Sequence, residues 1–240
     1  MERKKFLKKG IAALGGAFIV PLFYACSKSD DSGDETGSGS GSTDCTVAPT
    51  ETEGPFPTKS PSSYVLNDIT GGRPGAKMVA KITIGNVNNG CATLANAIVD
   101  IWHCDADGNY SEYGGSGMQS TNYQSVHFLR GRQVTDANGL VTFTSIFPGW
   151  YTGRATHIHI HIYNQSGNSL KVSQIAFPDE LCKTVNSTGS AYGYTKGISG
   201  YTNNASDNIF SDDTEGVQLA TLSGSLAAGY ELSIKLNVSA

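Results

Sequence analysis

Three histidines alternate with three isoleucines over residues 157–162. Successive side chains of a β-strand point to opposite faces, so a strand here separates the histidines from the isoleucines. Isoleucine is β-branched and suits the core face of a sheet. The stretch therefore predicts a strand that packs on a core with one face and displays a row of imidazoles with the other: His157, His159 and His161.

A row of imidazoles on one face favours a metal site. A single histidine on a strand is usually structural, but this row uses three of the five histidines in the chain. Tyr151 follows the turn at Pro148-Gly149 just upstream and can bend back toward the row. Arg154 adds a fixed cation, which no metal recruits as a ligand. We interpret the stretch as a metal-binding segment whose metal depends on the other residues that join it.

The remaining sequence has the pattern of many short strands. Of 240 residues, 29 are glycine and only 16 % are charged, and we find no long stretch with helical periodicity. We predict residues 178–216 to be irregular. The expected fold is all-β, an antiparallel β-sandwich of about eight strands with long loops that carry the site. Apolar alternation and turn residues predict strands at 77–87, 97–102, 127–135, 140–146, 157–162, 169–177 and 230–238.

The first 44 residues are expected to lie outside the folded domain. Residues 1–26 combine a basic start with a short apolar run, as in a secretory signal peptide. Ala25-Cys26 resembles a bacterial lipoprotein cleavage site, which makes Cys26 the expected lipid-bearing residue; ordinary cleavage without lipid is the alternative. Residues 27–44 read as a Gly/Ser/Asp-rich tether. We expect residues 45–240 to form an exported, periplasmic or extracellular domain, anchored to a bacterial membrane, at the outer membrane or cell surface.

Four further cysteines favour two disulfides, because an even number is typical of exported domains. A predicted strand separates Cys91 from Cys104 and holds their Cα atoms beyond the bridging limit of about 7 Å. Cys45 and Cys182 are therefore each expected to pair with one of these two, and the sequence leaves open which pairs with which.

Several motifs together resemble the intradiol ring-cleavage dioxygenases, especially the exported branch and the catalytic domain of protocatechuate 3,4-dioxygenases. The likeness covers about residues 45–238. Its parts are Glu53-Gly54-Pro55-Phe56, Trp102-His103-Cys104-Asp105-Ala106 with Gly108-Asn109-Tyr110, Arg130-Gly131, Thr135-Asp136 with Gly139, and Pro148-Gly149-Trp150-Tyr151 with Arg154 and His157-Ile158-His159.

The resemblance implies a non-haem Fe(III) held by two phenolates and two imidazoles. The matching positions are Tyr110, Tyr151, His157 and His159. Ferric iron is a hard Lewis acid that favours anionic oxygen, and a bound cation can deprotonate a phenol. This donor set is a poor one for zinc, which prefers His, Cys and carboxylate.

The resemblance also implies the reaction, which is cleavage of a catechol-type ring between its two hydroxyls with O2 to give a muconate-type dicarboxylic acid. Tyr151 would leave the metal and take up a substrate proton, Arg154 would stabilise developing negative charge, and Gln174 would stand near it. His161 matches no family ligand and is interpreted as structural or supporting. The elements that hold the carboxylate of protocatechuate have no convincing match, so the substrate stays open.

Two other functions compete with this one. The chain could be a catalytically inactive lipoprotein with a β-sandwich that binds a metal or a glycan. It could also be a histidine-rich zinc hydrolase, although the expected carboxylate base is missing. Nucleic acid is not expected as a partner, because the sequence has no basic patch or arginine-rich helix. The long helical segment through which catechol and hydroxyquinol dioxygenases dimerise has no counterpart, and the oligomeric state stays open.

Overall fold

The computed structural model describes residues 45–240. The predicted signal peptide, Cys26 and the tether lie outside the described residues. The described part has nine strands and one α-helix, with short 3-10 turns between them. The strands are β1 (Lys77–Asn86), β2 (Ala92–Thr93), β3 (Ile98–Trp102), β4 (Arg130–Val134), β5 (Leu140–Ile146), β6 (His157–Tyr163), β7 (Ser169–Ala176), β8 (Thr221–Ser225) and β9 (Gly229–Val238), and the helix is α1 (Asp179–Thr188).

The strands form two sheets, which confirms the predicted all-β sandwich. One sheet has the order β2-β1-β9-β8, with β5 also paired to β1, and the other has the order β4-β3-β6-β7. All pairs are antiparallel except β1 with β9, which run parallel from the pair Met78–Tyr230 to the pair Asn86–Val238. The β1–β9 pair departs from the antiparallel pairing of the predicted sandwich. Side chains alternate with period two in both arrangements, so the sequence pattern cannot separate them.

The core lies between the two sheets. The isoleucines of β6 (Ile158, Ile160 and Ile162) are fully buried in it, as predicted from their alternation with the histidines. They pack with apolar side chains of β1 and β9, including Ile82 and Leu236. The histidine face of β6 therefore points away from the core, on the outer surface of its sheet.

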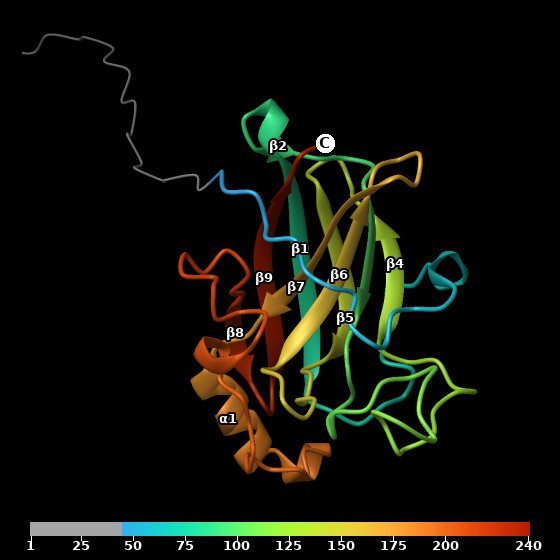
Figure 1. Ribbon diagram of the computed structural model, residues 1–240, viewed down its shortest axis with the longest axis vertical. Helices are drawn as coiled ribbons and strands as arrows, with labels where there is room; N and C mark the ends of the chain where they lie inside the picture. Colours follow the sequence, from blue (N-terminus) through green and yellow to red (C-terminus); the bar gives the residue numbers. More distant parts are fainter. Residues whose placement is uncertain (1–44) are drawn as a thin grey trace, which may run out of the picture. The chain divides into compact units, whose positions relative to one another are not determined.

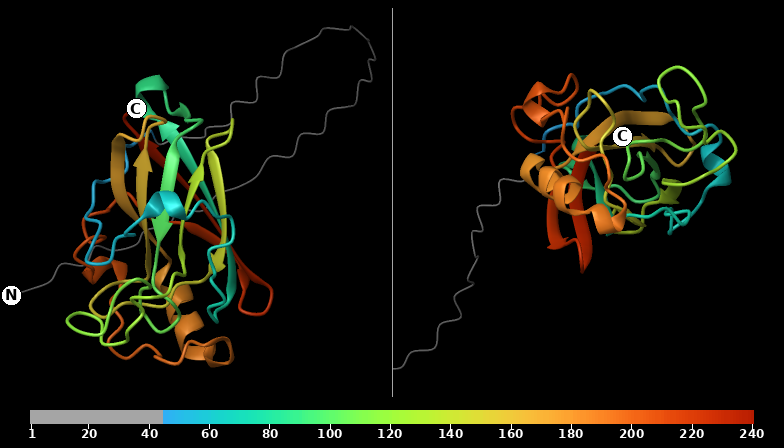
Figure 2. Two further views of the ribbon diagram at one scale, coloured as in Figure 1. Left: turned by 90° about the vertical axis from the view of Figure 1, so that its right-hand side faces the viewer. Right: turned by 90° about the horizontal axis from the view of Figure 1, so that it is seen from below.

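Helix α1 contradicts the prediction that residues 178–216 lack regular structure. It begins after Pro178, and Asp179 and Glu180 in its first turn suit the positive end of the helix dipole. Cys182 and Val185 are buried against the main core. In Figure 1 and in the left view of Figure 2, α1 lies with several loops at the end of the sandwich opposite the C-terminus.

The N-terminal arm, defined here as residues 45–60, crosses the outer face of the sheet that contains β6 (Figure 1, blue). The amide of Ala48 donates to the carbonyl of Asn237 on β9 (2.9 Å), and the amide of Glu51 donates to the carbonyl of Val172 on β7 (2.9 Å). Farther along, the arm reaches the histidine face of β6. The arm thus covers the row of imidazoles.

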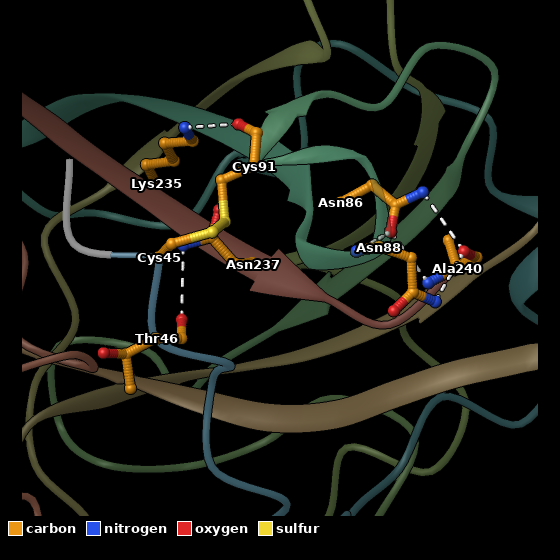
Figure 3. The surroundings of a disulfide bond; sticks show 8 residues. All are labelled: Cys45, Thr46, Asn86, Asn88, Cys91, Lys235, Asn237 and Ala240. Carbon is orange, nitrogen blue, oxygen red and sulfur yellow. Dashed lines mark hydrogen bonds between the residues drawn. A yellow bond between two sulfur atoms is a disulfide. The ribbon is translucent and has the colours of Figure 1, made fainter.

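One disulfide, Cys45–Cys91, ties the start of the arm to the turn after β1 (Figure 3). Lys235 of β9 donates to the Cys91 carbonyl at 2.8 Å in the same region. The predicted second disulfide is absent, because Cys104 and Cys182 are free and buried. The prediction was wrong for these two thiols: Cys104 packs with Trp102 and Tyr110, whereas Cys182 packs in the main core.

Within residues 45–240, no helix combines the length and apolar character that crossing a membrane requires.

Candidate metal centre and its pocket

The outer face of the β4-β3-β6-β7 sheet presents a cross-strand row of polar and aromatic side chains. His159 of β6 stands between Trp102 of β3 and Gln174 of β7, and Arg130 of β4 pairs with Trp102 on its other side. All four side chains are at most 3 % exposed, because the arm and neighbouring loops cover them. Four regular strands therefore fix the positions of this row.

Three predicted donor atoms converge on this face. The Oη of Tyr110 lies 3.0 Å from Nε2 of His157 and 3.4 Å from Nε2 of His159. The two Nε2 atoms are 3.1 Å apart. Two donors that each bind one ion at about 2.1 Å, at right angles, lie about 3 Å apart. The spacing of the three donors therefore suits a shared metal ion.

The hydrogen bond of His157 prepares it as a ligand. Its Nδ1 lies 2.7 Å from the carbonyl oxygen of Ala155, which can only accept, so Nδ1 carries the proton. In the neutral ring, Nε2 then presents its lone pair toward Tyr110 and His159. Burial, with the nearby charge of Arg154, lowers the pKa of His157 to about 3 and keeps the ring neutral.

His159 is held by packing. The Trp102 indole stacks on it with parallel planes and a centroid distance of 4.9 Å. On the arm, Gly54 has a φ of +67°, and a Cβ there would lie 3.0 Å from Cε1 of His159. Burial, with the proximity of His157, lowers the pKa of His159 well below its ordinary value. The ring is thus neutral and tightly enclosed.

Tyr110 comes from the loop after β3 and is fixed from two sides. Gln119 accepts from the Tyr110 amide (2.7 Å) and donates to its carbonyl (2.9 Å). Phe56 of the arm stacks on the Tyr110 ring at a centroid distance of 4.8 Å. Burial raises the pKa of this phenol well above its ordinary value, so the metal-free protein holds it protonated.

Tyr151, the fourth predicted donor, lines the same pocket, but its hydroxyl does not join the other three. The hydroxyl donates to the carbonyl of Met118 at 3.1 Å. Its ring meets Phe56 edge-on at 5.5 Å and Tyr110 edge-on at 6.1 Å. Tyr151 is therefore close to the centre, with its hydroxyl directed to a neighbouring loop.

Arg154 lies beside the histidines in a polar chain. Its Nη2 donates to Oε1 of Gln174 at 2.8 Å, and its Nε donates to Oδ2 of Asp207 at 2.9 Å. Gln174 in turn donates to the carbonyl of Thr52 on the arm at 2.9 Å. Gln174 is fully buried and touches Arg154, so it acts on the pocket through that side chain.

One pocket of about 370 Å³ is lined by Arg154 together with all four predicted donors. It has room for an aromatic ring beside the three donors. Its wall consists of Thr52, Gly54, Pro55, Phe56, Tyr110, Met118, Tyr151, Arg154, His157, His159, Asn208 and Ile209.

His161, the third histidine of the row, is directed elsewhere. Its Nδ1 lies 2.9 Å from Oε1 of Glu53, and its Nε2 lies 2.8 Å from Oγ of Ser169. It therefore supports the arm, in line with its interpretation as a structural residue. No cluster of three or more His, Cys, Asp or Glu suited to a metal occurs in residues 45–240. The donors that converge are two imidazoles and a phenol.

Three residues that shape the centre had no role predicted from the sequence. Asp207 lies far along the chain in a segment without a motif, so nothing pointed to its contact with Arg154. Gln119 is one polar residue of a polar loop. Arg130 belongs to a quoted motif, but its burial and its bond to the Phe56 carbonyl (2.7 Å) required the fold.

Comparison with known proteins identifies the family. A family model described as dioxygenase matches residues 53–188, more than half of the chain. A solved intradiol ring-cleavage dioxygenase from Tetranychus urticae is 28 % identical, with a TM-score of 0.69, and the match covers 81 % of this chain and 95 % of that one. The chain belongs to the intradiol ring-cleavage dioxygenase family.

More distant structures share the fold. The dioxygenase domain of a dioxygenase and carbohydrate-binding protein fusion from Streptomyces sp. SirexAA-E is 20 % identical, with a TM-score of 0.56, and the match covers 81 % of this chain and 99 % of that one. The 3-chlorocatechol 1,2-dioxygenase from Rhodococcus opacus 1CP is 18 % identical, with a TM-score of 0.56, covering 80 % and 72 %. No curated protein matches the chain.

Proposed function

We propose that this chain is a non-haem Fe(III) intradiol dioxygenase that acts on a catechol-type substrate. The carbon–carbon bond between the two hydroxyl-bearing carbons breaks, and both atoms of O2 enter the muconate-type dicarboxylic acid. The observation that supports this best is the meeting of Tyr110, His157 and His159 within 3.0–3.4 Å in one buried pocket.

The donor set fits ferric iron. His157 is a neutral imidazole with its lone pair toward the centre, and Tyr110 offers an oxygen that becomes anionic when a cation replaces its proton. Tyr151 is the proposed fourth donor, which requires its hydroxyl to leave the Met118 carbonyl. Fe(III) bound there supplies Lewis-acid activation of a chelated catechol toward O2.

The chain's own residues orient the substrate and manage charge and protons. Phe56, packed against both tyrosine rings, limits the pocket to a flat ring beside the donors. Tyr151 takes up a proton from the incoming catechol at its Oη and returns to a neutral phenol. Arg154, held by Asp207 and Gln174, presents a fixed guanidinium beside the reacting ring and stabilises negative charge that develops there.

Visible spectroscopy with iron analysis tests the proposal. Phenolate ligation of Fe(III) gives a charge-transfer colour, so protein loaded with one iron should absorb visible light and change colour with catechol under argon. Tyr110→Phe should remove or shift that band, and Tyr163→Phe, a tyrosine outside the pocket on the same strand as the histidines, should not. On admitting air, O2 consumption should equal the dicarboxylic acid formed.

The competing function, an inactive lipoprotein that binds a metal or glycan, predicts a different outcome. Iron-loaded protein that holds catechol without consuming O2 would favour it over catalysis. A colourless protein that binds zinc in preference to iron would reject the iron assignment itself. We favour the enzyme because the pocket provides a fixed cation, Arg154, beside the donors.

We also propose that the domain is exported and anchored to a bacterial membrane through lipid on Cys26. The support is the basic and apolar pattern of residues 1–26 and the small residue Ala25 before the cysteine. Expressed in a bacterium with labelled palmitate, the full chain should carry label and sediment with membranes. Cys26→Ala should lose both properties, and retention of label by this variant would contradict the anchor.

A further inference from the structure

The pocket has a single charged wall residue. Of the residues that line it, all in the described part of the chain, only Arg154 has a permanently charged side chain. Besides Arg154, Gly54, the two tyrosines and the two histidines, the lining consists of Thr52, Pro55, Phe56, Met118, Asn208 and Ile209. These six residues offer a ring substituent apolar contacts, one hydroxyl and one amide.

Asp207 pairs with that one charge. Its carboxylate is fully buried and accepts from Nε of Arg154 (2.9 Å) and from the amides of Ala155 (2.6 Å) and Ile209 (2.8 Å). Burial opposes its ionisation, but these hydrogen bonds outweigh burial, and the pKa of Asp207 is lowered. Asp207 thus stays anionic and fixes the position of the Arg154 guanidinium.

The next cation lies outside the pocket. A neighbouring cavity of about 420 Å³ shares Pro55, Phe56 and Met118 as a common wall and contains Lys59 and Glu112. The Lys59 ammonium lies 4.8 Å from the centroid of the Tyr113 ring. Lys59 lines this neighbouring cavity and not the first pocket.

On these grounds we infer that the pocket selects catechols whose ring substituents are uncharged, because its one charged lining residue, Arg154, is held by Asp207 and Gln174 to serve the reacting ring. The inference rests on the proposed function and names its substrate class. A substituent carboxylate would lose its water and find no second cation in the lining, while an uncharged substituent of the same shape gains the same apolar contacts.

Two probes of nearly equal shape isolate the charge, namely 3,4-dihydroxybenzamide and 3,4-dihydroxybenzoate. Iron-loaded protein should show kcat/KM for the amide at least about tenfold above that for the acid. Titration under argon, followed by the catecholate colour, should give the same order of Kd values without turnover. Equal values for the two probes, or preference for the acid, would overturn the inference.

Variants test whether the wall sets the preference. Asn208 is exposed and lines the pocket, so Asn208→Lys adds a cation without disturbing the core. The ratio of kcat/KM for the amide to kcat/KM for the acid should then shift toward the acid by about tenfold or more. Asn168→Lys makes the same change in the exposed β6–β7 turn and should leave the ratio unchanged. An unchanged ratio in Asn208→Lys would contradict the inference.

If Lys59→Ala alone removes cleavage of the acid, a cation outside the pocket recognises it and the inference fails. If no catechol is cleaved or bound, the proposed function fails; if both probes react equally well, only the inference fails.

Discussion

Removing the Cys45–Cys91 disulfide should destabilise the domain substantially. The bond closes a loop with a sequence separation of 46 residues. The chain-entropy relation for a loop of that length gives about 4 kcal/mol of stabilisation at 25 °C. For a domain of this size, 1 kcal/mol shifts Tm by about 2–4 °C, so the expected loss is about 8–16 °C. The arm that begins at Cys45 also carries Gly54 and Phe56, so the bond secures one end of the pocket's cover.

The assay is thermal unfolding of Cys45→Ser/Cys91→Ser beside the unmodified chain, with and without a reductant that reaches the bond. The reductant should lower the Tm of the unmodified chain to that of the double variant and leave the variant unchanged. Cys104→Ala removes a buried thiol that forms no disulfide and keeps the Cys45–Cys91 bond, so reductant should lower its Tm by as much as it lowers that of the unmodified chain. A double variant that unfolds within about 2 °C of the unmodified chain would refute the loop-closure argument.

Two further predictions concern the site and its surroundings. Gly54→Ala and Gly72→Ala both place a Cβ at positive φ (+67° and +74°) and should each cost about 1–2 kcal/mol in urea unfolding, but only the first meets a neighbour, His159. Gly54→Ala alone should therefore lower iron content and visible absorbance, and equal losses in both variants would contradict a direct contact. Burial lowers the pKa of His103 to about 4 from its ordinary 6.5, so the folded state binds fewer protons between these values. The contribution of neutral His103 to the free energy of unfolding is therefore complete above pH 6.5, and about 3 kcal/mol of it is lost as the pH falls to 4. His103→Gln should flatten the pH dependence of urea unfolding over that window.

Strand positions could be predicted wherever one face of a strand is buried. β1 and β9 alternate buried and less buried side chains, and β6 alternates isoleucines in the core with histidines under the arm; each strand was expected within a few residues. β8 was missed, because Thr221–Ser225 is short, small and polar and buries little. Helix α1 was missed because its ten residues bury only Cys182, Val185 and Asn186, too few to set a helical period.

The site was predictable only in part. The spacing of His157 and His159 was enough to predict that they share one face, because side chains two residues apart on a strand point the same way. Tyr110 entered through the family motif, because nothing in the sequence says that its loop folds back onto β6. The contact of Asp207 with Arg154 joins residues 53 apart in sequence, and no local pattern carries that information. The prediction of a second disulfide failed for a similar reason, because an even number of cysteines says nothing about where each thiol packs.

The four proposed iron donors differ in how firmly the fold holds them. His157 and His159 lie on a strand paired on both sides, and Tyr110 is clamped by Gln119 and Phe56. Tyr151 stands on a turn, and its hydroxyl is held by one bond to a backbone carbonyl of Met118, whose side chain is 63 % exposed. A donor that must leave when substrate arrives needs such loose surroundings, because each fixed contact would raise the cost of its movement. The proposed division into three permanent donors and one exchangeable donor thus follows from tight packing around Tyr110, His157 and His159 and loose packing around Tyr151.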